Sequence, residues 1–360
     1  MKELIRKNIH NITPYISGKP IEETKRELGL RQVIKLASNE NPLGPSPKAV
    51  EAIKKGLNAI NRYPDSQGFY LKKRLARQLN VKPANIILGN GSDEIIDIAI
   101  KTFVEDDENI ITSETTFLEY EIIAKINNRK ITTVPLRYFK YNLEGIKTRI
   151  DRKTKLIFIS NPNNPTGTYI TKSELDDFIT GLPENVILVL DEAYDAFIDV
   201  NDYPEGLAYT NKKNVIVLKT FSKAYGLAGL RIGYAIAKPG FIFYMERVRQ
   251  PFNVNILAQI AAEAALDDKG FLGKTRKAVL EGKAYLYGAL TKLGIAYLPS
   301  VANFILIDIA KDSGSVFKEM LKFGVIVREM QQYGLKNFIR VTIGTKKENE
   351  RFIKILKKTL

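Results

Sequence analysis

The sequence predicts an α/β fold, with a large domain built on a mostly parallel sheet flanked by helices and a smaller α+β domain. Between about residues 80 and 240, short and nearly continuous apolar runs alternate with helical stretches, which is typical of parallel strands buried on both faces. From about residue 271 onward, helical segments and strands are mixed. A chain of 360 residues also exceeds the length that a single core usually serves.

The strands that we predict for the large domain are apolar runs followed by polar residues. They lie at residues 85–90, 108–113, 155–160, 186–191, 215–220 and 231–237. In open α/β sheets, ligands bind outside the carboxyl ends of the strands. The polar residues that follow these runs are therefore candidates for a functional site.

We expect four parts along the chain. Residues 1–32 form an N-terminal arm, residues 33–240 the large domain and residues 271–360 the small C-terminal domain. Residues 241–270 are apolar at helical spacing, are interrupted at Pro251 and are long enough to bridge two domains. This segment is predicted to be an interdomain helix.

The composition removes several classes of chemistry. The chain has no Cys, which excludes disulfides, cysteine nucleophiles and thiolate metal sites. Its single His, His10, excludes multi-histidine metal sites, and we expect this side chain to be exposed. No metal is expected, and catalysis must use Lys, Tyr, Asp, Glu, Arg or a cofactor.

The net charge of +15 raises the question of nucleic-acid binding. The charge is scattered in short helical groups, without a basic tail or a nucleic-acid-binding motif. We interpret these groups as solvated helix faces. There is also no apolar signal region and no run of eighteen apolar residues. We therefore expect a cytoplasmic protein that binds neither nucleic acid nor membrane.

Lys223 is the first candidate for a catalytic residue. It follows a predicted strand directly after Ser222, and Arg231 lies eight positions further on. A lysine that forms Schiff bases must lose its proton near neutral pH, which requires burial or cationic neighbours such as Arg231. Ser222 and Arg231 together can also bind a phosphate. The alternative for an isolated loop lysine is an ordinary solvated charge.

Asp191 ends the apolar run 186–191, so a strand delivers a carboxylate to the edge of the sheet. A carboxylate beside a pyridine nitrogen would keep that nitrogen protonated, so that the ring can accept electrons. Tyr194, three residues later, could reach a phenolic oxygen on the same ring. The alternative is that Asp191 caps the following turn.

Two further loops follow strands. Ser92 and Asp93 begin a helix after Gly91, and free backbone N–H groups at such a start form an anion site. Asp93 could equally be a simple helix cap. The segment Asn-Pro-Asn-Asn-Pro-Thr-Gly at 161–167 forms a rigid loop that presents Asn164, although this amide could also serve only local backbone groups.

Together, the 161–167 loop, Asp-Glu-Ala-Tyr at 191–194, the Ser-Lys pair with Arg231, and Arg-Val-Thr-Ile-Gly-Thr at 340–345 resemble the fold-type I pyridoxal-phosphate (PLP) aminotransferases over nearly the whole chain. The resemblance implies a seven-stranded sheet and PLP as cofactor. Lys223 would then bind the cofactor and carry the proton, and Asp191 would pair with the pyridine nitrogen.

The same resemblance implies roles for further residues. Asn164 and Tyr194 would donate hydrogen bonds to the ring oxygen, and Phe117 would stack on the ring face. The cofactor phosphate would be held by Ser92, Asp93, Ser222 and Arg231.

Five segments narrow the subgroup, because they are similar to the histidinol-phosphate aminotransferases. They are residues 14–29, 36–47, 61–65, 325–330 and 333–345. This likeness implies an amino-group exchange between L-glutamate and imidazole acetol phosphate, giving L-histidinol phosphate and 2-oxoglutarate in histidine biosynthesis.

In that subgroup Arg340 would bind the glutamate carboxylate or the substrate phosphate, with Arg328 as a second phosphate ligand and Tyr15 in contact with the substrate. Planar guanidinium groups bind both kinds of anion bidentately, although either arginine could instead form a surface salt bridge. Tyr63 would reach the cofactor phosphate of a neighbouring subunit, which implies a homodimer. The arm 1–32 would pack on the small domain and on that subunit.

Three alternatives stay open. An aromatic or broad-specificity aminotransferase would share every cofactor residue. A threonine-phosphate decarboxylase of the same fold would also need phosphate-binding arginines, and release of carbon dioxide would distinguish it. A PLP-sensing DNA-binding regulator would need an added DNA-binding domain, for which the arm before residue 33 is too short.

Overall fold

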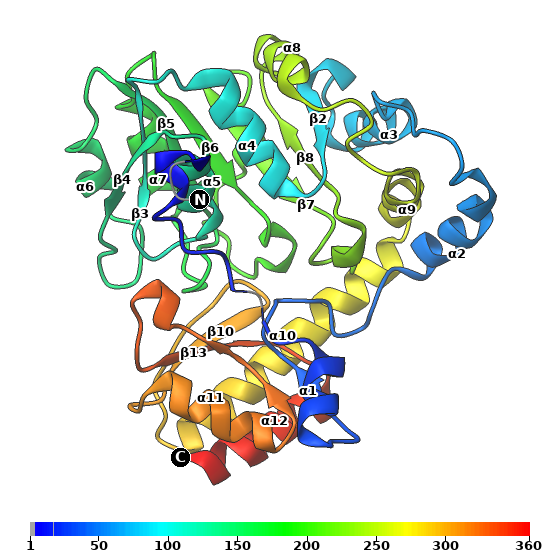
Figure 1. Cartoon of the computed structure of the whole chain (residues 1–360), viewed down its shortest axis with the longest axis vertical. Coiled ribbons are helices and arrows are strands. Elements are labelled where there is room, and N and C mark those ends of the chain that lie inside the picture. The colour runs from blue at the N-terminus through cyan, green and yellow to red at the C-terminus, as the bar shows by residue number, and fades with distance from the viewer. Residues whose placement is uncertain (1–3, 17) are drawn as a thin grey trace.

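The computed structural model describes residues 4–16 and 18–360 and contains a larger and a smaller domain (Figure 1). A seven-stranded sheet forms the centre of the larger domain, in the order β2-β8-β7-β6-β5-β3-β4. Its strands are β2 (Ile86–Gly89), β3 (Asn109–Ser113), β4 (Lys130–Val134), β5 (Thr154–Ser160), β6 (Ile187–Asp191), β7 (Val215–Thr220) and β8 (Gly233–Ile236). Five neighbouring strands are parallel, and β8 runs antiparallel to both of its neighbours. The predicted fold class is confirmed.

The sequence located six of these seven strands to within a few residues but did not locate β4. This strand lies at one edge of the sheet, and most of its side chains are only partly buried. Its sequence, Lys-Ile-Thr-Thr-Val, therefore lacks the continuous apolar run that marks a strand buried on both faces.

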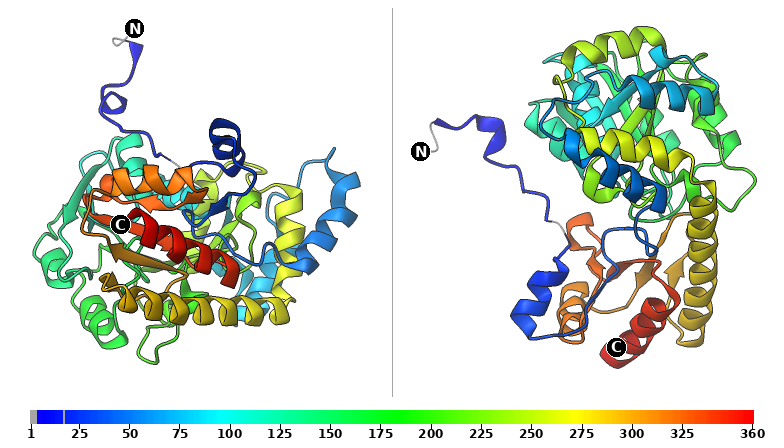
Figure 2. Two further views of the ribbon diagram at one scale, coloured as in Figure 1. Left: turned by 90° about the horizontal axis from the view of Figure 1, so that it is seen from below. Right: turned by 90° about the vertical axis from the view of Figure 1, so that its right-hand side faces the viewer.

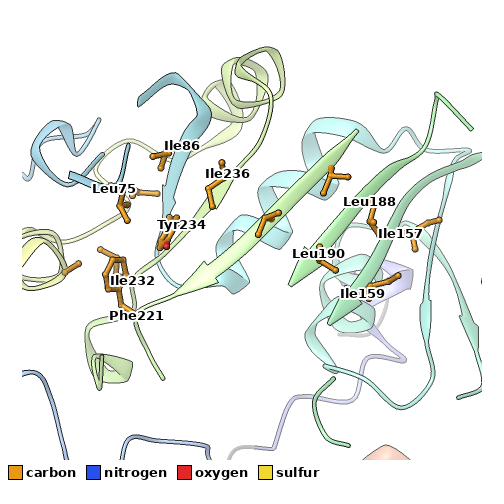
Figure 3. Close-up of a cluster of buried hydrophobic side chains, with 14 of the residues drawn as sticks. Leu75, Ile86, Ile157, Ile159, Leu188, Leu190, Phe221, Ile232, Tyr234 and Ile236 are labelled. Atoms are coloured by element: carbon orange, nitrogen blue, oxygen red, sulfur yellow. The ribbon is translucent and has the colours of Figure 1, made fainter. Parts of the chain in front are cut away.

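Both faces of the large sheet are covered by helices, because alternate residues of each strand point to opposite sides. On β6, Leu188 and Leu190 enter one hydrophobic cluster and Ile187 and Val189 enter another. Figure 3 shows the first cluster, in which strand side chains meet Leu75. Helices α3 (Phe69–Leu79), α7 (Lys172–Thr180) and α9 (Ile256–Leu266) contribute to that side, and α4 (Ser92–Phe103), α5 (Glu119–Ile126) and α8 (Pro239–Val248) to the other.

The smaller domain is built on an antiparallel sheet in the order β12-β13-β10-β9. Its strands are β9 (Tyr297–Leu298), β10 (Phe304–Asp308), β12 (Arg328–Glu329) and β13 (Phe338–Thr342). Helices α11 (Ser313–Lys322) and α12 (Lys346–Thr359) pack with it. A short parallel pair, β1 (Ile34–Lys35) with β11 (Val325–Ile326), joins the first residues of the predicted large domain to this region. Two further α-helices, between Pro47 and Lys147, are α2 (Pro47–Gly56) and α6 (Leu143–Lys147).

The connection between the domains differs from our prediction. Residues 241–270 are not one helix, because α8 ends at Val248 and α9 begins at Ile256, with Pro251 in the break. The helix that runs from the large to the small domain is α10 (Lys269–Lys292), the long diagonal helix of Figure 1. Asp268 caps its N-terminus, and the Asp268 carboxylate accepts a hydrogen bond from the backbone N–H of Phe271.

The N-terminal arm contacts both domains. Helix α1 (Ile21–Leu28) packs on the small domain through Ile21, which meets Leu321 and Ile326. Residues 4–16 project from the body of the molecule in Figure 2, and the side-chain amide of Asn8 donates to the last carbonyls of α5 in the large domain. The predicted contact with a partner subunit stays a prediction. His10 is exposed, as expected. Within residues 4–16 and 18–360, no helix is long and apolar enough to span a membrane.

Candidate active site

A cavity of about 160 Å³ lies at the carboxyl ends of the large-domain strands, on the side that faces the small domain. It brings together most of the residues that the sequence singled out. Eleven of them line it: Tyr15, Ser92, Asp93, Phe117, Asn164, Asp191, Tyr194, Ser222, Lys223, Arg231 and Arg340. Arg328 and Tyr63 are not lining residues.

Lys223 is a half-buried lysine that pairs with no carboxylate in the part of the chain that the structure describes. Its Nζ donates to the backbone oxygen of Ser38 at 3.3 Å. Burial, together with the positive charge of Arg340, lowers the pKa of Lys223 to about 8. The contributing cation is Arg340 rather than Arg231 as we expected, because Arg231 pairs with Asp93. The geometry therefore yields an amine that is partly neutral near physiological pH.

Asp191 ends β6 with its side chain buried at the floor of the cavity. One carboxylate oxygen accepts a hydrogen bond from the Tyr120 hydroxyl at 2.8 Å, and the other accepts from the backbone N–H of Ala193 at 3.1 Å. Burial raises the pKa of Asp191 to about 6, against the opposing effect of the Tyr120 hydrogen bond. The site thus holds a carboxylate with little compensation for its charge.

Two polar side chains point into the cavity with their orientation already fixed. The hydroxyl oxygen of Tyr194 accepts a hydrogen bond from the side-chain amide of Asn39 at 2.9 Å. The side-chain oxygen of Asn164 accepts from the Arg340 guanidinium. Because each oxygen is used in this way, the Tyr194 O–H and the Asn164 NH₂ remain as donors to a bound ligand.

The opposite end of the cavity is an anion site at the start of α4. Gly91, with a φ of 84°, turns the chain so that the first N–H groups of the helix face the cavity, beside Ser222 and Arg231. The Arg231 guanidinium and the Asp93 carboxylate form an ion pair of 2.9 Å. The positive φ of Gly91 favours glycine at this position, and a Cβ there would also lie 2.4 Å from Arg231 Nη2 and displace the guanidinium. For Asp93, the group suited to an anion is its backbone N–H rather than its carboxylate.

Arg328 and Arg340 lie opposite each other on the paired strands β12 and β13. Their exposed fractions are 6% and 4%. Arg340 donates to the oxygen of Asn164 and to the backbone oxygen of Ala37, and Arg328 donates to Ile16 O at 2.6 Å and Gln332 Oε1 at 3.0 Å. Neither forms an ion pair with a described residue, and the Nε of each is buried without a partner. Two uncompensated buried cations form a site for anions.

The aromatic candidates fall in three different settings. Phe117 lines the cavity and meets Tyr120 edge to face, with 5.5 Å between ring centroids. Tyr15, from the arm, also lines the cavity, and the Arg328 guanidinium lies over its ring at 5.3 Å. Tyr63 is 81% exposed and stacks on Phe252 instead.

The sequence alone did not assign roles to several lining or supporting residues. Asn39 is buried, has a φ of 55°, and bonds both Tyr194 and the Thr342 hydroxyl of β13. It lies in the 36–47 segment that we used only to recognise the subgroup. Tyr120 lies in no motif, and its contact with Asp191 joins residues 71 positions apart. The lining residues not predicted are Ser38, Asn39, Ser160, Ala193, Thr220 and Ala228.

The fold and the cavity, with a half-buried lysine and a buried strand-end carboxylate at the carboxyl edge of a mostly parallel sheet, define the class of the protein as a fold-type I aminotransferase. Residues 31–356 match the model of the aminotransferase class I and II family, and the chain belongs to that family.

Within this family the chain is similar to histidinol-phosphate aminotransferases. It is 49% identical over 357 residues to that of Moorella thermoacetica, covering 99% of this chain and 92% of the relative. It superimposes with a TM-score of 0.90 on the Sinorhizobium meliloti histidinol-phosphate aminotransferase in complex with pyridoxal-5'-phosphate, at 28% identity, covering 99% of this chain and 98% of that one. The resemblance read from the sequence is confirmed.

The fold is shared with an L-threonine-O-3-phosphate decarboxylase from Porphyromonas gingivalis. The TM-score is 0.79 at 24% identity, covering 91% of this chain and 99% of that one. The fold alone therefore does not separate the two reactions.

Proposed function

We propose that this aminotransferase exchanges an amino group between L-glutamate and imidazole acetol phosphate, giving L-histidinol phosphate and 2-oxoglutarate in histidine biosynthesis. The observation that carries the proposal is the pair Arg328 and Arg340, two buried arginines on paired strands with no carboxylate partner among the described residues. Such a pair suits a phosphorylated substrate, and the names of the similar proteins point to the same one.

The cofactor of the proposed reaction is pyridoxal 5'-phosphate, and the chemistry of the cavity fits it. At one end, Ser222, Arg231 and the start of α4 supply donors for a phosphate. At the other end, Asp191 supplies a carboxylate for a pyridinium nitrogen, and Lys223 supplies an amine for an aldehyde. When bound, this cofactor provides an electron-accepting ring for the substrate's α-carbon.

The residues around the ring would each act through a group that the structure leaves free. Asp191 would hold the ring nitrogen in its protonated form. The Tyr194 O–H and the Asn164 NH₂ would donate to the ring oxygen, because their oxygen atoms already accept from Asn39 and Arg340. Phe117 would cover one face of the ring.

Lys223 would move the proton of the reaction. With a pKa of about 8, its amine exchanges protons readily near neutral pH, which a general base requires. Its position beside Tyr194, with Nζ 5.7 Å from the ring centroid of that tyrosine, keeps the amine inside the cavity. We propose that its amine takes the α-proton of the amino donor and returns that proton to the carbon atom that carries the aldehyde in free PLP.

Arg340 and Arg328 would bind the two substrates in turn. Arg340 lines the cavity and can form a bidentate pair with the α-carboxylate of glutamate or with a phosphate. Arg328 lies next to it across β12 and β13, where it can take further phosphate oxygens. Tyr15, in contact with Arg328, would close this end over the substrate.

We further propose that the active unit is a homodimer in the cytoplasm. Tyr63 lies outside the cavity of its own chain and is largely exposed, which suits a role in the site of a neighbouring subunit. The arm before residue 33 would pack on that subunit as well. A cytoplasmic location suits substrates that carry phosphate charge, because charged groups cross a bilayer poorly.

An absorbance titration of the PLP-loaded protein tests the substrate. We expect histidinol phosphate to change the cofactor spectrum saturably and at much lower concentration than phenylalanine does. A response to aromatic amino acids alone would keep the chemistry and point to an aromatic aminotransferase. Release of carbon dioxide from threonine phosphate would instead indicate the decarboxylase.

Two matched variants connect that test to the structure. Arg328→Lys and Arg340→Lys each keep the charge but lose the planar fork. We expect Arg340→Lys to weaken the binding of both glutamate and histidinol phosphate. Arg328→Lys should weaken the binding of histidinol phosphate much more than that of glutamate. Equal effects of Arg328→Lys on the two substrates would contradict its role as a phosphate ligand.

A further inference from the structure

Tyr120 is a buried tyrosine whose hydroxyl meets the carboxylate at the floor of the active site. It lies on α5, has no solvent exposure, and donates to Asp191 Oδ2 at 2.8 Å. The second hydrogen bond to Asp191 comes from a backbone group, the N–H of Ala193. Across residues 4–16 and 18–360, Tyr120 is therefore the one side chain that donates to Asp191.

The ring of Tyr120 is fixed on two sides, so its hydroxyl has a defined position. It stacks on Phe158 of β5 with 4.9 Å between centroids and an interplanar angle of 14°. It also meets Phe117, which lines the cavity, edge to face at 5.5 Å and 85°. The same ring thus contacts the side chain expected to cover the cofactor and bonds the carboxylate expected to face its nitrogen.

The direction of the hydrogen bond is also determined. Burial and the charge of Asp191 raise the pKa of Tyr120 well above its ordinary value, so the phenol keeps its proton and can only donate to the carboxylate. A hydrogen bond donated to a carboxylate stabilises the ionised form. This acts against the burial of Asp191, which favours the neutral acid.

We propose that Tyr120 is a positioning residue of the amino transfer: its hydroxyl holds the Asp191 carboxylate ionised and directed at the ring nitrogen of the cofactor. The proposal rests on the proposed role of Asp191. An ionised Asp191 keeps the pyridine nitrogen protonated, and loss of the bond moves the shared proton from the nitrogen towards the carboxylate. Tyr120 acts only through Asp191 and does not line the cavity itself.

The test compares Tyr120→Phe with Tyr141→Phe in the PLP-loaded enzyme. Tyr141 is a second buried tyrosine nearby, and its hydroxyl bonds Thr116 at 2.6 Å and accepts from Ser160 N at 3.0 Å, but does not bond Asp191. Both variants remove one buried hydroxyl and keep the ring. Any effect of lost packing or of a lost buried hydrogen bond should therefore appear in both.

Four measured quantities compare the two variants. With ¹⁵N-labelled PLP, NMR reports how far the ring nitrogen is protonated, and we expect a lower protonated fraction only in Tyr120→Phe. We expect the dissociation constant for PLP to rise and kcat to fall, each by about tenfold, which is typical for the loss of one hydrogen bond to a charged group. KM for glutamate should stay within about twofold, since no substrate contact is removed.

The outcomes distinguish this proposal from the assignment of Asp191. If Asp191→Asn leaves the ring nitrogen as protonated as in the unmodified enzyme, the role of Asp191 fails, and the role of Tyr120 fails with it. If Asp191→Asn lowers the protonation and Tyr120→Phe behaves like Tyr141→Phe, only the role of Tyr120 is overturned.

A fluorinated tyrosine at position 120 provides a second variant that preserves both ring and hydroxyl, in case Tyr120→Phe folds poorly. Its more acidic phenol is a stronger donor, so the ring nitrogen should become more protonated than in the unmodified enzyme. An unchanged or opposite NMR shift would overturn the proposal.

Discussion

Two buried carboxylates follow one another at the end of β6, and they have different partners on the two sides of the sheet. Glu192 is 2% exposed and Asp191 is 4% exposed. Glu192 Oε2 lies 2.8 Å from Lys219 Nζ of β7, and Glu192 Oε1 accepts from the backbone N–H of Gly206 at 2.9 Å. Asp191 has no lysine or arginine within ion-pair distance in the described part of the chain and receives only the bonds from Tyr120 and Ala193.

The period of the strand explains how neighbours reach such different surroundings. Successive residues of a strand point to opposite faces of the sheet. Asp191 therefore points to the same face as Val189, which is covered by α4 and α5 and on which the cavity opens. Glu192 points to the other face, together with Leu190. Lys219 points to that face as well, together with Val217 of the adjacent strand. A buried charge is costly without a partner. We infer that Glu192 serves the fold, whereas Asp191 is left for a cationic ligand.

The largest effect should come from removing the amine of Lys223, which lines the same cavity as Asp191. Lys223→Ala should reduce turnover by at least about 10⁴-fold, because the proton carrier and the covalent attachment are both lost. Steady-state assays of amino-group exchange between glutamate and 2-oxoglutarate measure this loss. PLP should still bind to the variant, but without a covalent bond. Substantial steady-state activity in this variant would contradict the assignment of Lys223.

The next largest effect should separate the two carboxylates directly. Asp191→Asn should lower kcat by about 10²–10⁴-fold, since an amide cannot hold the ring nitrogen in its protonated form. Glu192→Gln is the matched control, because it makes the same change one residue later on the opposite face of the sheet. Its kcat per folded molecule should stay within about threefold of the unmodified enzyme. Similar losses of kcat in the two variants would remove the distinction between the faces.

Part of this arrangement could be predicted from the sequence. An apolar run that ends in Asp191 indicates a strand delivering a carboxylate to the sheet edge, and Lys223 and Asn164 follow neighbouring strands in the same way. The partners could not be predicted, because Tyr120 and Lys219 come from other elements and their contacts depend on strand order and register. The helix between the domains was also misplaced, since residues 241–270 and α10 are both apolar at helical spacing, and only packing distinguishes their roles.

A smaller effect should appear in the free energy of unfolding. Here the variant of Glu192, rather than that of Asp191, should show the larger loss. Glu192→Gln leaves the half-buried Lys219 with Asp195 as its one remaining acidic partner among the described residues. Breaking a buried pair typically costs about 3–5 kcal/mol, and the remaining partner should reduce the loss to about 2–3 kcal/mol. Urea unfolding measures this difference. Glu51→Gln, which breaks an exposed pair with Lys55, is the control and should change stability by less than about 0.5 kcal/mol.

The smallest effect is the contribution of Asp191 to the dependence of stability on pH. Its folded pKa of about 6 lies above its ordinary value of 3.8, so the folded chain binds this proton more tightly than the unfolded chain does. Lowering the pH from 7.5 to 5 protonates Asp191 in the folded state and relieves its burial cost, which adds roughly 1 kcal/mol to the stability of the PLP-free protein.

Asp191→Asn cannot gain this proton, so any stability advantage it has at pH 7.5 should shrink by the same amount at pH 5. Urea unfolding of both PLP-free proteins at the two pH values measures the difference, in which the titration of all other groups largely cancels. A stability difference that is independent of pH would mean that Asp191 is fully compensated in the folded chain. In that case the cationic ligand would not be needed to explain the burial of Asp191.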